Sequence, residues 1–175
     1  MKIAYSHLLN FLKKKPSIEE LSKKLFQLGH EHELEGEIFD LEITPNRGDC
    51  LSLKGLARDL NYFYSAKLDQ NIFKDELPKA NFKFENKAEN LCPNISFVEI
   101  EIEGEVKKYA PYLENYFKDL SLNKNNFFTD ISNYLAYETG QPTHCYDADK
   151  LAAHLVLEKR NKKEHFKTLL GNEIE

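Results

Sequence analysis

The chain has 175 residues, of which 41% are hydrophobic and 30% charged, and it carries a formal net charge of −5 and three widely spaced cysteines. This length suits one ordinary domain or a small domain joined to a medium one, and no apolar run approaches the roughly 20 residues of a membrane span. The acidic balance argues against sequence-independent nucleic-acid binding, and the cysteines do not suggest a disulfide framework. These features indicate a soluble, cytoplasmic protein that binds neither membranes nor DNA.

The N-terminal region carries the pattern of a helix pair. Apolar residues at helical spacing predict a first helix over residues 6–14. Ser17 and Glu20 have the spacing of a capping box, which predicts that a second helix begins there and ends at Gly29. The acidic stretch 31–37 is predicted to be a connection.

The next stretch changes to an alternating pattern and then turns sharply. Residues 37–43 alternate as in a strand, and the Pro and Gly of residues 44–48 indicate a tight turn. Asp49 is predicted to cap a helix over residues 50–64. A phosphate-binding or catalytic role for Arg47 with Asp49 is the alternative, but capping and a local ion pair are favoured.

His30 and His32 are the candidate metal ligands of this region. They are flanked by Glu31 and Glu33, but two histidines two residues apart without a third ligand are weak support for a metal site. A solvated loop is favoured, so no metal site is predicted.

The second half is predicted to mix strands and helices. After a polar linker over residues 67–81, the alternation of residues 96–103 predicts a strand with one buried face. Pro111 is expected to begin a helix, and residues 127–138 a second one that ends at Gly140. Further strands are predicted at residues 155–160, at residues 166–170 and around Ile174. Segregated helices and antiparallel strands predict an α+β fold.

Two long stretches resemble the β subunit of bacterial-type phenylalanyl-tRNA synthetases. They are LEITPNRGDCLSLKGLARDL, residues 41–60, and FFTDISNYLAYETGQPTHCYDADKL, residues 127–151. The second combines a D-x-x-N-Y helix with a G-Q-P-x-H segment. The resemblance covers essentially the whole chain and implies a small helix-rich N-terminal domain over residues 1–66. It further implies part of an antiparallel-sheet domain, which edits mischarged tRNA, over residues 82–175.

The resemblance also implies what the chain lacks. In that family an OB-fold insertion interrupts the N-terminal domain, but only the short link 31–37 stands at that place here. The chain is expected to be truncated about halfway through the editing domain, either as a piece of a longer protein or as a complete gene product. The resemblance implies a partner α subunit and phenylalanine tRNA. ATP and magnesium belong to the whole enzyme, and no cofactor is expected in this chain.

Four residues are the predicted site. The resemblance places His144 in the editing pocket, where an imidazole orients or deprotonates the attacking water; the alternative is a loop histidine that fixes the turn. Gln141 and Thr143 of the same segment are predicted to bind substrate. Asn123 is also assigned to binding, although some members have arginine there, and its alternative role is that of a turn residue. Cys145 is predicted to be small and semi-buried.

Three functions follow from these observations. The favoured one is the structural and editing part of a ligase that attaches phenylalanine to tRNA, with hydrolysis of tyrosyl-tRNA as its reaction. The second is a non-catalytic scaffold or subunit-interaction module that has lost editing. The third is a free-standing hydrolase of mischarged tRNA that relies on His144 alone.

Overall fold

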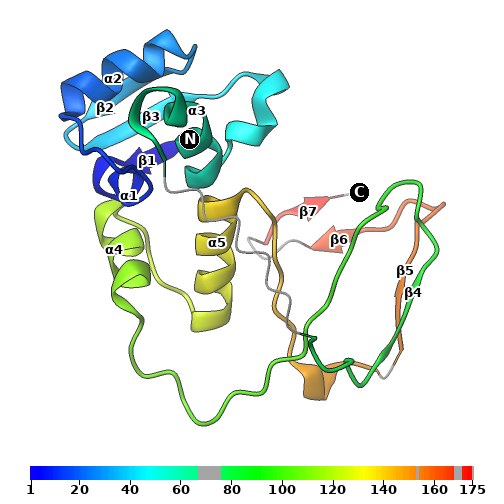
Figure 1. Cartoon of the computed structure of the whole chain (residues 1–175). Coiled ribbons are helices and arrows are strands. Elements are labelled where there is room, and N and C mark those ends of the chain that lie inside the picture. Colours follow the sequence, from blue (N-terminus) through cyan, green and yellow to red (C-terminus); the bar gives the residue numbers. More distant parts are fainter. Residues whose placement is uncertain (67–75, 153, 168–170, 175) are drawn as a thin grey trace. The chain divides into compact units, whose positions relative to one another are not determined.

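The structure is a computed structural model that describes residues 1–66, 76–152, 154–167 and 171–174. Helices are interspersed with short strands (Figure 1), and the predicted α+β class is confirmed. Part of the predicted linker, residues 67–75, lies outside the described residues. The end of the predicted strand 166–170 also lies outside them.

Contacts divide the chain into two compact units. Of the described residues, the first unit takes 1–66 and 104–145, and the second takes 76–103 and 146–174. Residues 104–145 thus pack with the N-terminal elements. The predicted domain boundary, with 82–175 as one domain, stays a prediction.

The first unit contains a three-stranded sheet and five α-helices. Its elements are β1 Lys2–Ala4, α1 Tyr5–Leu9, α2 Ile18–Gln27, β2 Glu31–Glu35, β3 Ile38–Glu42, the 3-10 helix η1 Pro45–Cys50, α3 Leu53–Tyr64, α4 Pro111–Asp119 and α5 Phe127–Thr139. The sheet is antiparallel, in the order β1-β3-β2. The prediction that residues 31–37 form a connection is therefore wrong. Most of this stretch is β2, and Gly36, with a φ of 62°, turns the chain into β3.

Helices α2 and α3 form the main core of this unit against the sheet. Leu21 and Leu25 of α2 are fully buried, as are Leu56 and Leu60 of α3. Phe39 of β3 joins the same cluster. Because these side chains recur three or four residues apart, each helix buries one continuous stripe, as the sequence pattern predicts.

Side-chain caps fix where the helices begin. The Ser17 hydroxyl accepts a hydrogen bond from the Glu20 N–H (3.3 Å), which confirms the predicted start of α2. The Glu20 carboxylate, however, accepts from the Tyr64 hydroxyl (3.1 Å) and not from the cap. The predicted capping by Asp49 is wrong, because Ser52 caps α3 through the Gly55 N–H at 3.0 Å.

Helices α4 and α5 pack against each other through aromatic side chains. Leu113, Tyr116 and Phe117 of α4 are buried against Tyr134 and Tyr137 of α5. Pro111 begins α4 as predicted, since a proline at the first helical position has no N–H to lose. This hairpin carries the segment that the sequence assigns to function.

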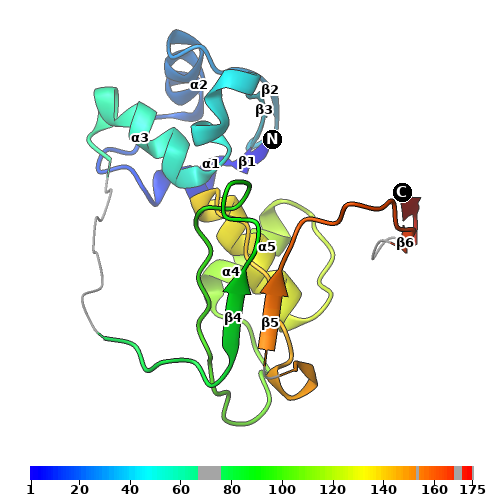
Figure 2. The same cartoon turned by 90° about the vertical axis from the view of Figure 1, so that its right-hand side faces the viewer.

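The second unit contains two small sheets. Its elements are β4 Lys83–Asn86, the 3-10 helix η2 Ala148–Lys150, β5 His154–Leu157, β6 Phe166–Lys167 and β7 Glu173–Ile174. Strands β4 and β5 lie side by side and run parallel (Figure 2), whereas β6 and β7 pair antiparallel. The predicted sheet is thus antiparallel only in part.

The prediction of a strand over residues 96–103 is wrong. Its apolar residues Val98, Ile100 and Ile102 are 58%, 71% and 44% exposed, and no ladder is formed by this stretch in the part of the chain that the structure describes. Alternation alone does not bury a face, because a strand also needs a neighbour that supplies the hydrogen bonds and the opposing side chains.

None of the helices among the described residues is long and apolar enough to cross a membrane.

Candidate functional site

Helix α5 positions the segment that follows it. The Asn126 side chain caps its first turn by accepting from the Thr129 N–H at 3.1 Å. Gly140 ends the helix with a φ of 77°, a left-handed conformation that glycine adopts without a steric penalty. Its N–H still donates to the Ala136 carbonyl at 2.8 Å. Pro142 then excludes helical backbone at Gln141, so the chain leaves α5 extended.

Residues 141–145, the return segment, run back along α5. The Thr143 hydroxyl lies 3.5 Å from the Ser132 carbonyl oxygen, and the Cys145 Sγ lies 3.4 Å from the Ser132 hydroxyl. Two residues that are two positions apart therefore face the helix. His144 stands between these two residues in the sequence.

The predicted site residues divide into two groups. Gln141, Thr143 and His144 lie together on the return segment, and all three are exposed. Asn123, also exposed, precedes the opposite end of α5, whose 13 residues span about 20 Å. Cys145 is exposed, so its prediction as semi-buried is wrong.

Lys124, the cation nearest to Asn123 in the sequence, is already engaged. Its ammonium group contacts the Glu114 carboxylate and lies 4.9 Å from the centre of the Tyr109 ring. Tyr109 in turn donates to the buried Asp130 carboxylate at 2.6 Å. These contacts tie the α4–α5 connection to both helices, so Lys124 has a structural role.

A second polar cluster surrounds Asp59 in the N-terminal part of the unit. The Arg47 guanidinium donates to the Asp59 carboxylate at 2.6 Å and, through two nitrogens, to Asp49 at 3.1 Å. His30 Nε2 lies 3.1 Å from the same Asp59 oxygen, and Arg58 also contacts Asp49. The expected ion pair of Arg47 is confirmed, but His30 is only 3% exposed, so its prediction as part of a solvated loop is wrong.

This cluster has the residue types of a metal site but not its electrostatics. Ligand atoms of His30, Cys50 and Asp59 lie within 4.8 Å of one another. An Arg47 nitrogen, however, lies 2.8 Å from the Cys50 sulfur and 2.6 Å from Asp59, so a cation already occupies the space between them. Burial raises the pKa of the Cys50 thiol to about 12, whereas zinc binds the thiolate. The arrangement therefore is a structural ion-pair network.

The carboxylates of this network stay ionised. Burial alone would raise the pKa of Asp59, but hydrogen bonds from Arg47 and His30 outweigh it, and the pKa is lowered. The Arg47 hydrogen bonds likewise hold the pKa of Asp49 far below its usual range. Sequence reasoning missed Asp59 as the residue that collects these partners, because Arg47 and Asp59 are 12 positions apart and come together only where η1 packs against α3.

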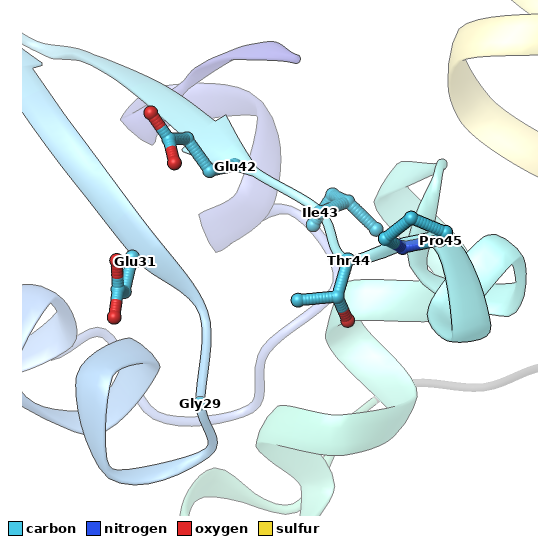
Figure 3. Close-up of a pocket in the computed structure, with 6 residues that line it drawn as sticks. All are labelled: Gly29, Glu31, Glu42, Ile43, Thr44 and Pro45. Carbon is cyan, nitrogen blue, oxygen red and sulfur yellow. The ribbon is translucent and has the colours of Figure 1, made fainter.

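An open hollow lies beside this network at the end of the sheet (Figure 3). It has a volume of about 310 Å³. Six residues line it: Gly29, Glu31, Glu42, Ile43, Thr44 and Pro45. Two of these residues, Glu31 and Glu42, are paired directly in the β2–β3 ladder, so their side chains lie on the same face of the sheet. No predicted site residue lines it.

A third cluster joins α1 to the α4–α5 hairpin. His7, only 7% exposed, places Nε2 at 3.1 Å from the Asp119 carboxylate and Nδ1 at 3.0 Å from the Tyr137 hydroxyl. Tyr137 also accepts from the Ala4 N–H at 3.4 Å, and Asp119 accepts from the Ser6 hydroxyl at 3.0 Å. Among the described residues, His7 Nε2 has no partner with hydrogen-bond geometry, so the nearby Asp119 carboxylate acts on the imidazole through its charge.

His7 makes stability depend on pH. Burial lowers the pKa of its imidazole, although the Asp119 carboxylate acts in the opposite direction. A histidine in an unfolded chain has a pKa of about 6.5, so below this pH the unfolded chain binds a proton that folded His7 resists. Its contribution to stability is complete above about pH 6.5 and is lost as the pH falls toward the lower folded-state pKa.

We therefore expect the urea midpoint to fall between about pH 7.5 and about pH 5.5, and to fall less steeply in His7→Gln, which has no imidazole at this position. Urea melts monitored by circular dichroism at the two pH values measure both slopes. Equal slopes in the wild type and the variant would contradict the assignment of this pH dependence to His7.

Comparison with known proteins places these features in a class. Residues 97–175, which include helices α4 and α5, the return segment and the C-terminal part of the second unit, match the family described as B3/4 domain. The chain is thus an α+β protein with a B3/4 region preceded by a helix-rich module.

Curated relatives identify the larger group. The chain is 33% identical over 132 residues to the phenylalanine–tRNA ligase β subunit of Rickettsia bellii, and the aligned residues make up 72% of this chain and 15% of that protein. It is 27% identical over 174 residues to the β subunit of a Wolbachia species, and this alignment covers 89% of the chain and 22% of the relative. It is 37% identical over 124 residues to the β subunit of Rickettsia typhi, and this alignment covers 67% of the chain and 15% of the relative. The chain is a homologue of these β subunits, and it spans less than a quarter of their length.

Proposed function

We propose that this chain forms the N-terminal and editing part of a phenylalanine–tRNA ligase, in which the return segment takes part in the hydrolysis of tyrosyl-tRNA. The observation that carries the proposal is the exposed histidine of the G-Q-P-T-H sequence on a segment anchored to α5 at Ser132. The similarity to β subunits and the B3/4 match support the same assignment.

The need for such a reaction has a physical origin. An apolar pocket built for phenylalanine rejects tyrosine by only about a hundredfold, because the added hydroxyl is accommodated at little cost. A second site that hydrogen-bonds the tyrosine hydroxyl reverses the preference, since phenylalanine would leave its polar groups unpaired. Hydrolysis at that site removes tyrosine after it has been attached.

His144 is the residue proposed to act on the ester. Its imidazole orients a water molecule, accepts the water's proton as the oxygen attacks the ester carbonyl, and returns the proton to the departing ribose hydroxyl. Gln141 and Thr143 are proposed to contact the substrate from the same segment. Because Thr143 also contacts α5, it holds the backbone on which His144 is carried. Positioning of the ester and the water is the main contribution assigned to these residues.

The partners belong to the same proposal. A catalytic α subunit would bind ATP and magnesium and attach the amino acid, and phenylalanine tRNA would present the ester to this chain. With a net charge of −5, the chain is expected to contact tRNA locally.

A non-catalytic scaffold is the second candidate function. Asn123 is neutral, and Lys124 is engaged by Glu114 and Tyr109, so neither supplies a ready cation beside the substrate. On this alternative the chain would join subunits without acting on the ester.

Hydrolysis of preformed esters separates the two candidates. Tyrosyl-tRNA and phenylalanyl-tRNA, both made on phenylalanine tRNA, are incubated with this chain assembled with its α subunit, and the ester remaining is followed with time. We expect the tyrosyl ester to disappear well above the rate in buffer and the phenylalanyl ester to persist. Equal, buffer-like rates for both esters would establish the scaffold.

A further inference from the structure

The C-terminal turn of α5 is held by three elements of the N-terminal module. Tyr137 shares its hydroxyl between His7 of α1 and the Ala4 N–H of β1, at 3.0 and 3.4 Å. One residue later, Glu138 pairs with Lys54 of α3 at 2.9 Å. These residues immediately precede Gly140, at which the return segment begins.

Gly140 itself approaches the N-terminal module closely. A Cβ atom at this position would lie 3.3 Å from the Ser52 Cβ and 3.4 Å from its hydroxyl, which is tighter than ordinary packing. Ser52 is 2% exposed and caps α3 through the Gly55 N–H, so it is itself fixed. The end of α5 therefore rests on the beginning of α3.

The other end of α5 is organised differently. Asn126 caps it through Thr129, and Asp130 accepts from the Tyr109 hydroxyl and the Asn125 N–H. These partners all come from residues 109–130, which belong to the hairpin. A disturbance at His7 should thus reach the C-terminal end of α5 and leave its N-terminal end unchanged.

We infer that His7 and Tyr137 are positioning residues for the return segment: they fix the last turn of α5 against the N-terminal module and thereby set where His144 lies. The consequence for hydrolysis rests on the proposed function, whereas the positioning itself does not. Tyr137 acts through a hydroxyl held on both sides and through a half-buried ring. Only the Gly140 hinge and Gln141–Thr143 separate this turn from His144, so a small tilt of the turn displaces the imidazole.

Amide hydrogen exchange at the two ends of α5 tests the positioning in the 175-residue chain. Tyr137→Phe removes one hydroxyl and keeps the ring. The Gly140 and Gln141 amides, which donate to Ala136 and Thr139, should exchange about fivefold faster in this variant, the factor equivalent to about 1 kcal/mol for one hydrogen bond. The Thr129 and Asp130 amides at the other end should exchange as in the wild type.

Two further variants complete the test. Tyr112→Phe, which removes a tyrosine hydroxyl from the half-exposed face of α4, is the matched control and should change neither end. His7→Gln should raise exchange at Gly140 as Tyr137→Phe does, and the double variant should raise it by less than the two single changes combined, because the two side chains share one contact. Uniform acceleration along α5, additive effects, or no change at Gly140 would overturn the inference.

The kinetic consequence is measured in the assembled ligase. Tyr137→Phe should lower kcat for tyrosyl-tRNA hydrolysis about fivefold and leave KM unchanged, because the ester still binds but the imidazole is displaced. A wild-type ligase without hydrolysis would refute the proposed function and leave the exchange result standing. Hydrolysis with an unchanged kcat in the variant would refute the role of Tyr137 in it.

Discussion

Replacing Asp59 by asparagine is expected to lower the free energy of unfolding by about 3 kcal/mol, the range for removing one partner of a largely buried ion pair. The Asp59 side chain is 16% exposed and accepts from Arg47 and His30. An asparagine has nearly the same shape but presents an N–H group or a neutral oxygen to these donors. The variant therefore leaves Arg47 with Asp49 as its charged partner and deprives the buried His30 nitrogen of a charged acceptor.

Urea unfolding at neutral pH measures this change, with Glu114→Gln as the control. Glu114 pairs with Lys124, but both side chains are nearly half exposed, so its loss should cost less than about 1 kcal/mol. A similar, small effect of both variants would mean that the Asp59 network contributes no more than a surface ion pair.

His144→Ala is expected to slow the hydrolysis of tyrosyl-tRNA by the assembled ligase about 100-fold, the lower range for loss of a group that handles a proton in the transition state. Folding should be unaffected, because the side chain is exposed and the anchors of the return segment, Thr143 and Cys145, remain. Single-turnover hydrolysis measures the loss, and the attachment of phenylalanine should proceed at its normal rate.

His165→Ala is the matched control, because His165 is also an exposed histidine but stands outside the return segment. Its hydrolysis rate should equal that of the wild type. If both variants hydrolyse the ester at the wild-type rate, His144 only fixes the turn after α5.

Local signals in the sequence predict several helix ends, although the first helix, predicted over residues 6–14, covers only Tyr5–Leu9. Ser17, Pro111 and Gly140 mark helix ends by their own chemistry, and the structure places them there. The α+β class and the buried stripes of α2 and α3 follow from periodicity in the same way. These features depend on neighbours within one or two turns, so a sequence window contains them.

Features that depend on distant partners are not predicted. His30 is predicted to be solvated, but it is buried because Asp59, 29 positions away, packs beside it. Asp49 is predicted to cap a helix because its pairing with Arg58 cannot be seen in the sequence. The contact between His7 and Tyr137 spans 130 positions. The alternation of residues 96–103 is real, but it cannot tell whether a neighbouring strand is present.

The candidate site shows the same division. Gln141, Thr143 and His144 are adjacent in sequence, so one motif brings them together without help from the fold. Asn123 is joined to them only by resemblance, and the length of α5 lies between it and Gln141. The anchoring of the segment at Ser132 needed the structure, because a helix surface and an extended chain that returns along it have no shared sequence pattern.

The most direct measurement of the central claim is the net accumulation of tyrosyl-tRNA during charging by the assembled ligase. Phenylalanine tRNA is incubated with ATP and tyrosine, and the tyrosine esterified to the tRNA is followed for the wild type and for His144→Ala. We expect no accumulation with the wild type, a steady rise with the variant, and equal charging with phenylalanine by both. Tyrosyl-tRNA that accumulates equally with both proteins would contradict an editing role for this chain.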